Sequence, residues 1–299
     1  MVIIPSIGRN SLVDLVEQIK VDERDSGIDA EIFVALNGIL PSGLEFENVH
    51  ILNISKDPIG VAAAMNSALN KVHDGLVWTI ADDETWKVGK FRSDLESIRD
   101  LEGNWILLPS SIFNDELGKA IRPRIRLKEG ERLLDYLYGH IHFSRNPRYI
   151  SLSGACAKRS TWLNVKFSET MQTREDIDYV YRQEMLGCKF AQSTKVTVGI
   201  NVKLERGAIR EQGAAEAYSW ATERLTRKQR VGFIGCAWVK PLVYSGNLAE
   251  MKKMKKLLAS QRSFIFSKSQ ITTFLLLSYW IIVARIIGFK LGHFWRTNS

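Results

Sequence analysis

The chain has 299 residues, 45% of them hydrophobic and 25% charged, which is the composition of a folded protein with one large or two small domains. Its net charge of +8 is uneven: residues 224–299 hold 14 basic residues and one acidic residue, whereas the rest holds 27 basic and 32 acidic residues. Two parts of opposite charge indicate two roles. The three cysteines are far apart and form no CxxC pair, which argues against a disulfide scaffold and fits a reducing cytosol.

Apolar runs and helical periodicities alternate through the first 109 residues. We expect strands at 2–6, 31–36, 49–54, 76–81 and 105–109, and helices at 11–20, 61–72 and 90–100. Such alternation is typical of an α/β fold with a mostly parallel central sheet and helices on both faces. Ligands of such sheets bind beyond the carboxyl ends of the strands. Three of these ends carry Pro5-Ser6, Asn37-Gly38 and Asp82-Asp83-Glu84.

The pattern is less regular after residue 109. We expect irregular structure that covers the site at 110–149, a strand at 151–157, a helix at 177–186 and a last strand at 195–203. The arginines between 122 and 148 are candidates for holding a diphosphate, and a solvated basic surface is the equal alternative for any one of them. His140 and His142 would share a face of a strand and bind a metal, but a polar loop is the simpler interpretation.

Three acidic residues, Asp82, Asp83 and Glu84, follow the fourth expected strand. Because like charges at a strand end repel one another, a divalent cation is the usual compensation, and Mg²⁺ or Mn²⁺ binds carboxylates together with substrate phosphates. Such a cation would stabilise a diphosphate as a leaving group. The alternative is a solvated acidic turn at a helix N-terminus.

Three segments in this half carry a resemblance to a known family. Residues 3–9 read Ile-Ile-Pro-Ser-Ile-Gly-Arg, residues 60–69 read Gly-Val-Ala-Ala-Ala-Met-Asn-Ser-Ala-Leu, and residues 78–84 read Trp-Thr-Ile-Ala-Asp-Asp-Glu. Their order and spacing resemble the nucleotide-binding half of family 2-type glycosyltransferases with the Rossmann-like GT-A fold. That family has a first strand ending in Pro and a small polar residue, and a Gly-x-x-x-Ala-x-Asn helix before the strand with its Asp-x-Asp motif. The resemblance extends over residues 1–190.

The resemblance implies a nucleotide-sugar pocket. Pro5, Ser6 and Arg9 would line it, and Asn66 would support it. Asn37 stands where the family usually has an Asp that contacts the base or ribose, so the identity of the nucleotide stays open.

The resemblance also implies a metal site. Asp82-x-Glu84 corresponds to Asp-x-Asp with a conservative change, and Asp83 is the alternative ligand after a shift of one residue. We expect Asp82, Asp83 and Glu84 near the diphosphate, with Mn²⁺ or Mg²⁺ as the cofactor.

A second acidic motif, Glu175-Asp176, precedes the helix expected at 177–186. The family has a Gly-containing strand, then Glu-Asp opening a helix, then Arg and Gly, and here Gly154, Arg182 and Gly187 correspond. By this resemblance Asp176 is the general base that deprotonates the acceptor hydroxyl, and Glu175 orients the acceptor. A base opposite the departing diphosphate gives inversion. Acidic residues stabilised by the helix dipole are the alternative.

The C-terminal segment combines basic and apolar residues. Lys252, Lys253, Lys255 and Lys256 precede the uncharged run 271–284, which as a helix would extend about 21 Å and not the roughly 30 Å of a hydrocarbon core. We prefer an interfacial or re-entrant helix over a short transmembrane helix or a helix buried in the protein or a dimer. Because the run after the basic residues is apolar, we expect an anionic membrane surface and not nucleic acid as the partner.

The sequence therefore predicts a catalytic domain at 1–222, with a nucleotide-sugar half at 1–109 and an acceptor half at 110–222, and a helical membrane-associating tail at 223–299. We expect a metal-dependent, inverting hexosyltransferase that moves a sugar from a nucleoside-diphosphate donor to a glycan or lipid-linked acceptor in cell-surface polysaccharide synthesis. With no visible signal peptide, we expect it at the cytoplasmic face of a membrane. The alternatives are a non-catalytic nucleotide-binding module and a sugar nucleotidyltransferase.

Overall fold

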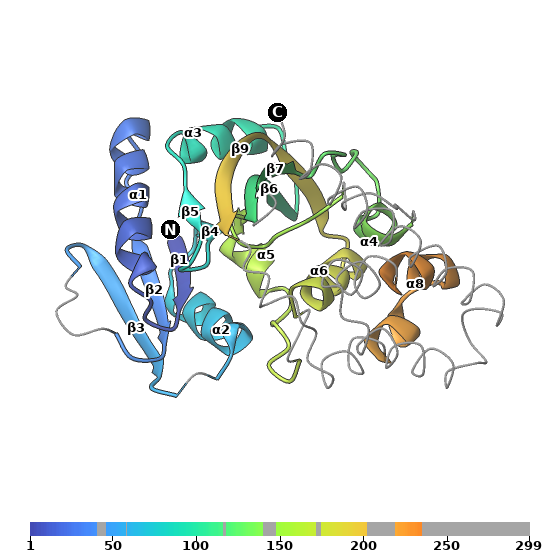
Figure 1. Ribbon diagram of the computed structural model, residues 1–299, viewed down its shortest axis with the longest axis horizontal. Coiled ribbons are helices and arrows are strands. Elements are labelled where there is room, and N and C mark those ends of the chain that lie inside the picture. The colour runs from blue at the N-terminus through green and yellow to red at the C-terminus, as the bar shows by residue number, and fades with distance from the viewer. Residues whose placement is uncertain are drawn as a thin grey trace, which may run out of the picture.

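A central sheet with helices on both faces forms the body of the protein (Figure 1). The computed structural model describes residues 1–40, 46–57, 59–115, 118–139, 148–171, 175–201 and 219–234. The strands are β1 (Val2–Ser6), β2 (Ile32–Asn37), β3 (Val49–Ser55), β4 (Leu76–Thr79), β5 (Thr85–Trp86), β6 (Trp105–Asp115), β7 (Gly118–Arg122), β8 (Cys156–Lys158) and β9 (Lys189–Asn201). The helices are α1 (Ser11–Ser26), α2 (Val61–Lys71), α3 (Lys90–Ile98), α4 (Leu133–Tyr138), α5 (Arg159–Leu163), α6 (Glu175–Met185) and α8 (Arg227–Ile234).

The strands lie in the order β3-β2-β1-β4-β8-β6-β9-β5, and β7 pairs with β6. The first four in this order are parallel, so the carboxyl ends of β1, β2 and β4 meet at one edge. Beyond β4 the sheet is mixed, because β8 runs antiparallel to both of its neighbours whereas β6 and β9 are parallel. The predicted α/β class is confirmed, and parallel pairing occurs among β3, β2, β1 and β4 and again between β6 and β9.

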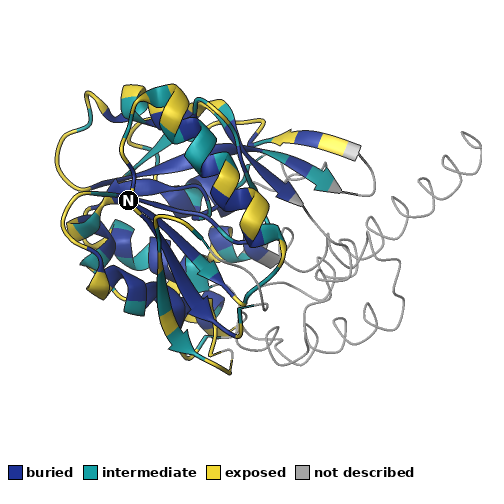
Figure 2. Ribbon diagram, turned by 90° about the vertical axis from the view of Figure 1, so that its left-hand side faces the viewer, coloured by how far each residue is buried: buried dark blue, intermediate teal, exposed yellow. Residues whose placement is uncertain are grey.

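The core lies on both faces of the sheet, as Figure 2 shows by the dark strands between helices that are exposed only on their outer sides. Val2 and Ile4 of β1 pack with α1 and α3, whereas Ile3 between them packs with α2. Because successive side chains of a strand point to opposite faces, a strand covered on both sides needs apolar residues throughout. This requirement explains why the first strands appear in the sequence as continuous apolar runs.

The stretch expected to be irregular, 110–149, is more ordered than predicted. β6 continues to Asp115 and forms a hairpin with β7, and α4 follows. The strand was not visible in the sequence because Ser110 and Ser111 occupy buried positions, where Ser110 Oγ donates to the Ser193 carbonyl at 2.6 Å. His140 and His142 lie outside the described residues.

The strand expected at 151–157 is shorter than predicted. Ala155 N donates to the Leu152 carbonyl at 3.0 Å, and Gly154 has a φ of +85°, so this part is a tight turn and only β8 is extended. The last strand begins at Lys189 and not at 195, because β9 pairs with β6 over most of its length.

The C-terminal end of the described structure packs on α4. Phe233 of α8 meets Tyr138 edge to face, with ring centroids 5.2 Å apart, and Trp220 lies 5.9 Å from the Phe233 ring. α8 falls within the range predicted as tail, yet it belongs to the packed core. Over the residues the structure describes, no helix is long and apolar enough to cross a bilayer. The run 271–284 and its basic residues lie outside the described residues.

Candidate functional site

Ser6 and Asp82 meet at the carboxyl ends of β1 and β4. The strands pair in parallel with Ile3 opposite Thr79, so the residues three positions further along lie at the same level. Ser6 Oγ donates to Asp82 Oδ2 at 2.7 Å, and the backbone N–H of Ile7 donates to the same oxygen at 3.3 Å. Both side chains are buried, and this contact joins two residues that the resemblance assigns separately to the nucleotide pocket and to the metal site.

Arg9 forms ion pairs with both of the aspartates that follow β4. Its Nη1 forms an ion pair with Asp82 Oδ1 and lies 3.2 Å from Asp83 Oδ2. The side chain of Arg9 is 32% exposed and that of Asp83 27%, whereas Asp82 is 3% exposed. The repulsion between these carboxylates, from which the sequence predicted a cation, is therefore partly relieved by the chain itself, and the accessible groups are Arg9 and Asp83.

The Glu84 side chain contacts a residue of the expected acceptor half, 110–222. Its Oε2 accepts a hydrogen bond from Ser153 Oγ, which in turn accepts one from the backbone of Ala81 at 2.8 Å. Burial raises the pKa of Glu84 to about 7; the Ser153 hydrogen bond lowers it, and the nearby Asp83 charge adds to the increase. Glu84 is therefore a carboxyl that changes charge near neutral pH.

The donor atoms at this edge suit a cation that also binds a diphosphate. Across the described part of the chain, no three His, Cys, Asp or Glu side chains converge to hold a metal ion. Both oxygens of Asp82 already accept bonds from Ser6, Ile7 and Arg9. Mg²⁺ usually takes one or two carboxylates and fills its remaining positions with phosphate and water, and the neighbouring Asp83 and Glu84 offer such a pair. The residues therefore fit a shared site and not a three-carboxylate cage.

The two predicted asparagines act on the backbone around the site. Asn37 Oδ1 accepts from Ile59 N at 2.9 Å, and its Nδ2 donates to the Gly60 carbonyl at 3.0 Å, which fixes the entry to α2. Asn66 Nδ2 donates to the Phe167 carbonyl at 2.9 Å, and its Oδ1 accepts from Phe167 N at 2.8 Å. Asn37 thus holds the turn that leads into α2, and Asn66 ties α2 to the segment that precedes α6. Pro5 lies half-buried beside Ser6 at the end of β1.

Glu175 and Asp176 occupy the first turn of α6, where the positive end of the helix dipole favours acidic residues. Both are half-buried, and Asp176 Oδ1 accepts from the backbone of Ile177 at 2.8 Å. Asp178 has a different role that the sequence did not reveal. It is buried and accepts from Arg182 Nε at 2.7 Å and from Trp220 Nε1 at 2.8 Å, so it anchors the helix that carries Asp176.

Tyr149 connects the two acidic motifs. Burial raises the pKa of its hydroxyl above the usual range, and the charges of Glu84 and then Asp176 raise it further. The charges of both carboxylates therefore raise the pKa of one phenol. The Tyr149 ring packs edge to face on Phe113, with centroids 4.7 Å apart, and the Arg122 guanidinium lies 4.7 Å from the centre of that Phe113 ring. In the sequence Tyr149 was only one of several aromatics in a stretch expected to cover the site.

The sequence matches no known family model and no curated protein. The structure is similar to the crystal structure of S. aureus TarS 1–349, with a TM-score of 0.57 and 12% identity over 85% of this chain and 77% of that chain. The same TarS fragment in complex with UDP-GlcNAc gives 0.55 and 12% over 93% and 86%, and its complex with UDP gives 0.53 and 13% over 85% and 77%. At this identity the similarity shows the fold alone, which is consistent with the expected GT-A type.

Proposed function

We propose that this protein is a glycosyltransferase that uses a nucleoside-diphosphate sugar as its donor. The observation that carries the proposal is the Ser6–Arg9–Asp82 cluster at the carboxyl ends of β1 and β4. It stands in a fold similar to that of TarS, which was crystallised with UDP and with UDP-GlcNAc. In sheets of this kind ligands bind at that edge.

On the donor side, Arg9 and the acidic groups after β4 would bind the diphosphate. The partly exposed Arg9 guanidinium is a bidentate donor suited to phosphate oxygens and is held in place by Asp82. Bound Mg²⁺ or Mn²⁺ would supply positive charge that stabilises the leaving diphosphate. Asp83 and Glu84 would hold that cation, and Asn37 would keep the wall of the pocket in place.

On the acceptor side, Asp176 would remove the proton from the attacking hydroxyl. It lies at the start of α6, and its charge acts on Tyr149 together with that of Glu84. A base within hydrogen-bond reach of the acceptor contributes about 10²–10⁴-fold to the rate. With the base opposite the departing diphosphate, the transfer would invert the anomeric carbon, and Glu175 would orient the acceptor.

The proposed acceptor and location are based on the C-terminal sequence. The basic residues 252–256 and the apolar run 271–284 suit an anionic membrane surface. We therefore propose a glycan or lipid-linked acceptor at the cytoplasmic face of a membrane.

The test measures donor binding and turnover separately. Wild-type protein is incubated with Mn²⁺ and a panel of nucleotide sugars, with binding followed by calorimetry and release of the nucleotide followed in the presence of candidate acceptors. We expect Asp176→Asn to lower turnover at least about 100-fold with donor affinity retained, because it removes only the base. Glu96→Gln is the matched control, since Glu96 is 54% exposed and pairs only with Lys195 among the contacts described.

Each outcome of this test decides a different claim. Unchanged turnover in Asp176→Asn would remove Asp176 from the mechanism. Binding of a nucleotide sugar without turnover would favour a non-catalytic module. A wild-type protein that binds none of the panel would contradict the proposed function itself.

A further inference from the structure

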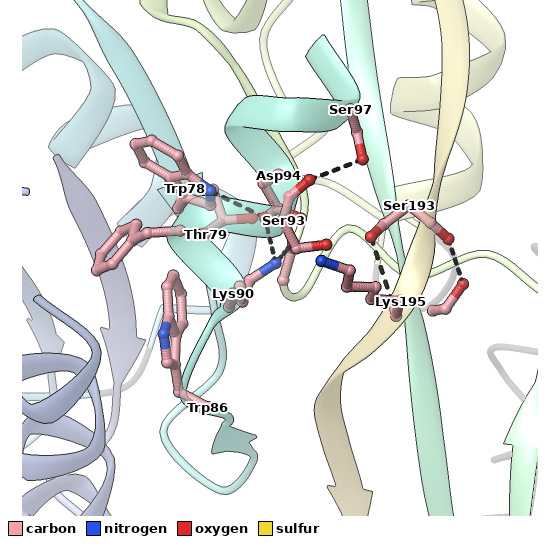
Figure 3. Close-up of polar contacts among 12 residues, drawn as sticks. Trp78, Thr79, Trp86, Lys90, Ser93, Asp94, Ser97, Ser193 and Lys195 are labelled. Carbon is pink, nitrogen blue, oxygen red and sulfur yellow. Dashed lines mark hydrogen bonds and ion pairs between the residues drawn. The ribbon is translucent and has the colours of Figure 1, made fainter. Parts of the chain in front are cut away.

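A fully buried ammonium group lies behind the candidate site. Lys90, the first residue of α3, has a side chain that is 0% exposed. Its Nζ donates to Asp94 Oδ2 at 2.6 Å and to the Gly154 carbonyl at 2.8 Å, and it lies 5.1 Å from the centre of the Trp86 ring. Figure 3 shows Lys90 and Asp94 meeting next to Trp78. Lys90 and Asp94 are not among the residues to which the proposed function assigns donor binding or proton transfer.

The pair is a poor device for stability alone. Removing two charges from water is costly, and apolar residues of similar volume are often as stable as a buried ion pair. Asp94 is 1% exposed, and its Oδ1 has no hydrogen-bond partner among the described residues, although Oδ2 also accepts from Trp78 Nε1 at 3.0 Å. Because Asp94 Oδ1 has no partner among the described residues, stability does not explain this buried pair. The remaining contact of the ammonium is its hydrogen bond to the Gly154 carbonyl, and we look for the role of Lys90 there.

The position of Lys90 is fixed independently of that bond. Asp22 of α1 is fully buried and accepts from the backbone N–H groups of Gly89 and Phe91 at the start of α3. It also accepts from Trp86 Nε1 at 2.7 Å, which holds the ring beneath the ammonium. Because α3 is anchored to α1 in this way, Lys90 reaches the turn at 152–155 from a rigid base.

The bonded carbonyl belongs to the turn that carries Ser153. Gly154 N donates to the Thr79 carbonyl of β4, and a Cβ at Gly154 would lie 2.4 Å from a methyl of Val198, so the backbone passes close to β9. The preceding residue, Ser153, donates to Glu84 and accepts from Ala81. A chain of contacts thus runs from the ammonium through one carbonyl to the hydroxyl that orients Glu84.

We propose that Lys90 is a positioning residue for the transfer reaction. Its charge-assisted bond to the Gly154 carbonyl fixes the 152–155 turn and, through Ser153, the direction in which Glu84 points. Asp94 offsets the buried ammonium charge and so contributes to stability, not to the direction of the Lys90–Gly154 bond. This inference rests on the proposed function for its kinetic consequence, while the effect on the turn is independent of any activity.

Two variants of the full chain separate positioning from stability. Lys90→Met with Asp94→Asn removes both charges at nearly constant volume and leaves an amide oxygen as the acceptor for Trp78 Nε1, so we expect a melting temperature close to that of wild type. The turn then loses its donor, and we expect kcat to fall about tenfold or more, because small displacements of catalytic groups are costly. Asp94→Asn leaves the Lys90–Gly154 bond and should lower the melting temperature while keeping kcat near wild type.

The decisive readout is the pattern across the two variants. Loss of kcat in the thermally stable double variant and its retention in the less stable Asp94→Asn supports positioning, whereas kcat that follows the melting temperature in both overturns it. Amide hydrogen exchange over 151–158, measured without substrate, should be faster in the double variant, and unchanged exchange also overturns the proposal. If wild type uses no nucleotide sugar, the proposed function fails and the exchange measurement still decides the role of Lys90.

Discussion

Glu84 illustrates how one carboxyl can couple the site to pH. Burial and the Asp83 charge raise its pKa to about 7, compared with an ordinary value of 4.5. A group with a raised pKa in the folded state contributes stability that is fully present below 4.5 and is lost as the pH rises through 7. Above neutral pH, the Glu84 carboxylate is ionised in the folded protein, where its charge is less favourable than in the unfolded chain.

Replacing Glu84 with Gln should remove this pH dependence. The amide oxygen can still accept from Ser153, and no charge forms at any pH. We expect the free energy of unfolding of Glu84→Gln to exceed that of wild type by about 3 kcal/mol at pH 8. Urea titrations should show the difference shrinking as the pH is lowered toward 5, and a difference that is constant across this range would contradict the assignment.

Arg9 is the second residue whose loss has a defined result. Arg9→Met should weaken UDP binding about tenfold or more, because a charged hydrogen bond to phosphate is lost and Asp82 and Asp83 keep their repulsion. Calorimetry in Mn²⁺ measures the Kd, and circular dichroism checks the fold. Arg92→Met, which removes an exposed arginine paired with Asp25, is the control. Equal affinities in the two variants would exclude Arg9 from the nucleotide pocket.

At the scale of elements, α3 is anchored to α1 by one side chain. Asp22 is buried within α1 and accepts from Trp86 Nε1 and from two backbone N–H groups at the start of α3. No residue within α3 makes a side-chain cap there, since Gly89 is the N-cap. The neighbouring helix therefore supplies the cap that the local sequence lacks.

Asp22→Ala should be among the more damaging single changes in this half of the protein. It leaves three buried donors unsatisfied, and we expect a loss of about 3 kcal/mol in the free energy of unfolding. Asp25→Ala on the same helix removes an acidic residue that is 49% exposed and should change stability by less than about 0.5 kcal/mol. Chemical denaturation compares them, and similar losses would refute the capping role.

The same elements show what the sequence could and could not predict. The first strands and the ends that bear Ser6, Asn37 and Asp82 were predictable, because strands covered on both faces leave apolar runs that stop where the site begins. The hairpin of β6 and β7 was not predictable, because buried serines interrupt the apolar run of β6. Asp22 and Lys90 are charged residues that pattern reasoning assigns to the surface, and only tertiary contacts explain their burial. The link from Ser153 to Glu84 depends on a turn whose geometry no local signal specifies.

At the scale of the whole molecule, a shared fold persists without a recognisable sequence. The similarity to TarS structures has 12–13% identity, and no family model matches. Such a fold requires apolar residues at two-faced strand positions and few fixed side chains elsewhere, so most of the sequence is free to differ. The opposite charges of the two parts of the chain, in contrast, carry no information about the fold.

The position of β8 has a mechanical consequence. This strand belongs to the second half of the chain but lies between β4 and β6, and Thr79 of β4 exchanges backbone hydrogen bonds with the adjoining Gly154 and Ala155. A hinge motion between the halves would have to break these backbone hydrogen bonds between β4 and residues 154–155. Closure of the two halves on one another as rigid bodies is therefore excluded. On the proposed function, substrates would enter and leave past the connections at the strand ends.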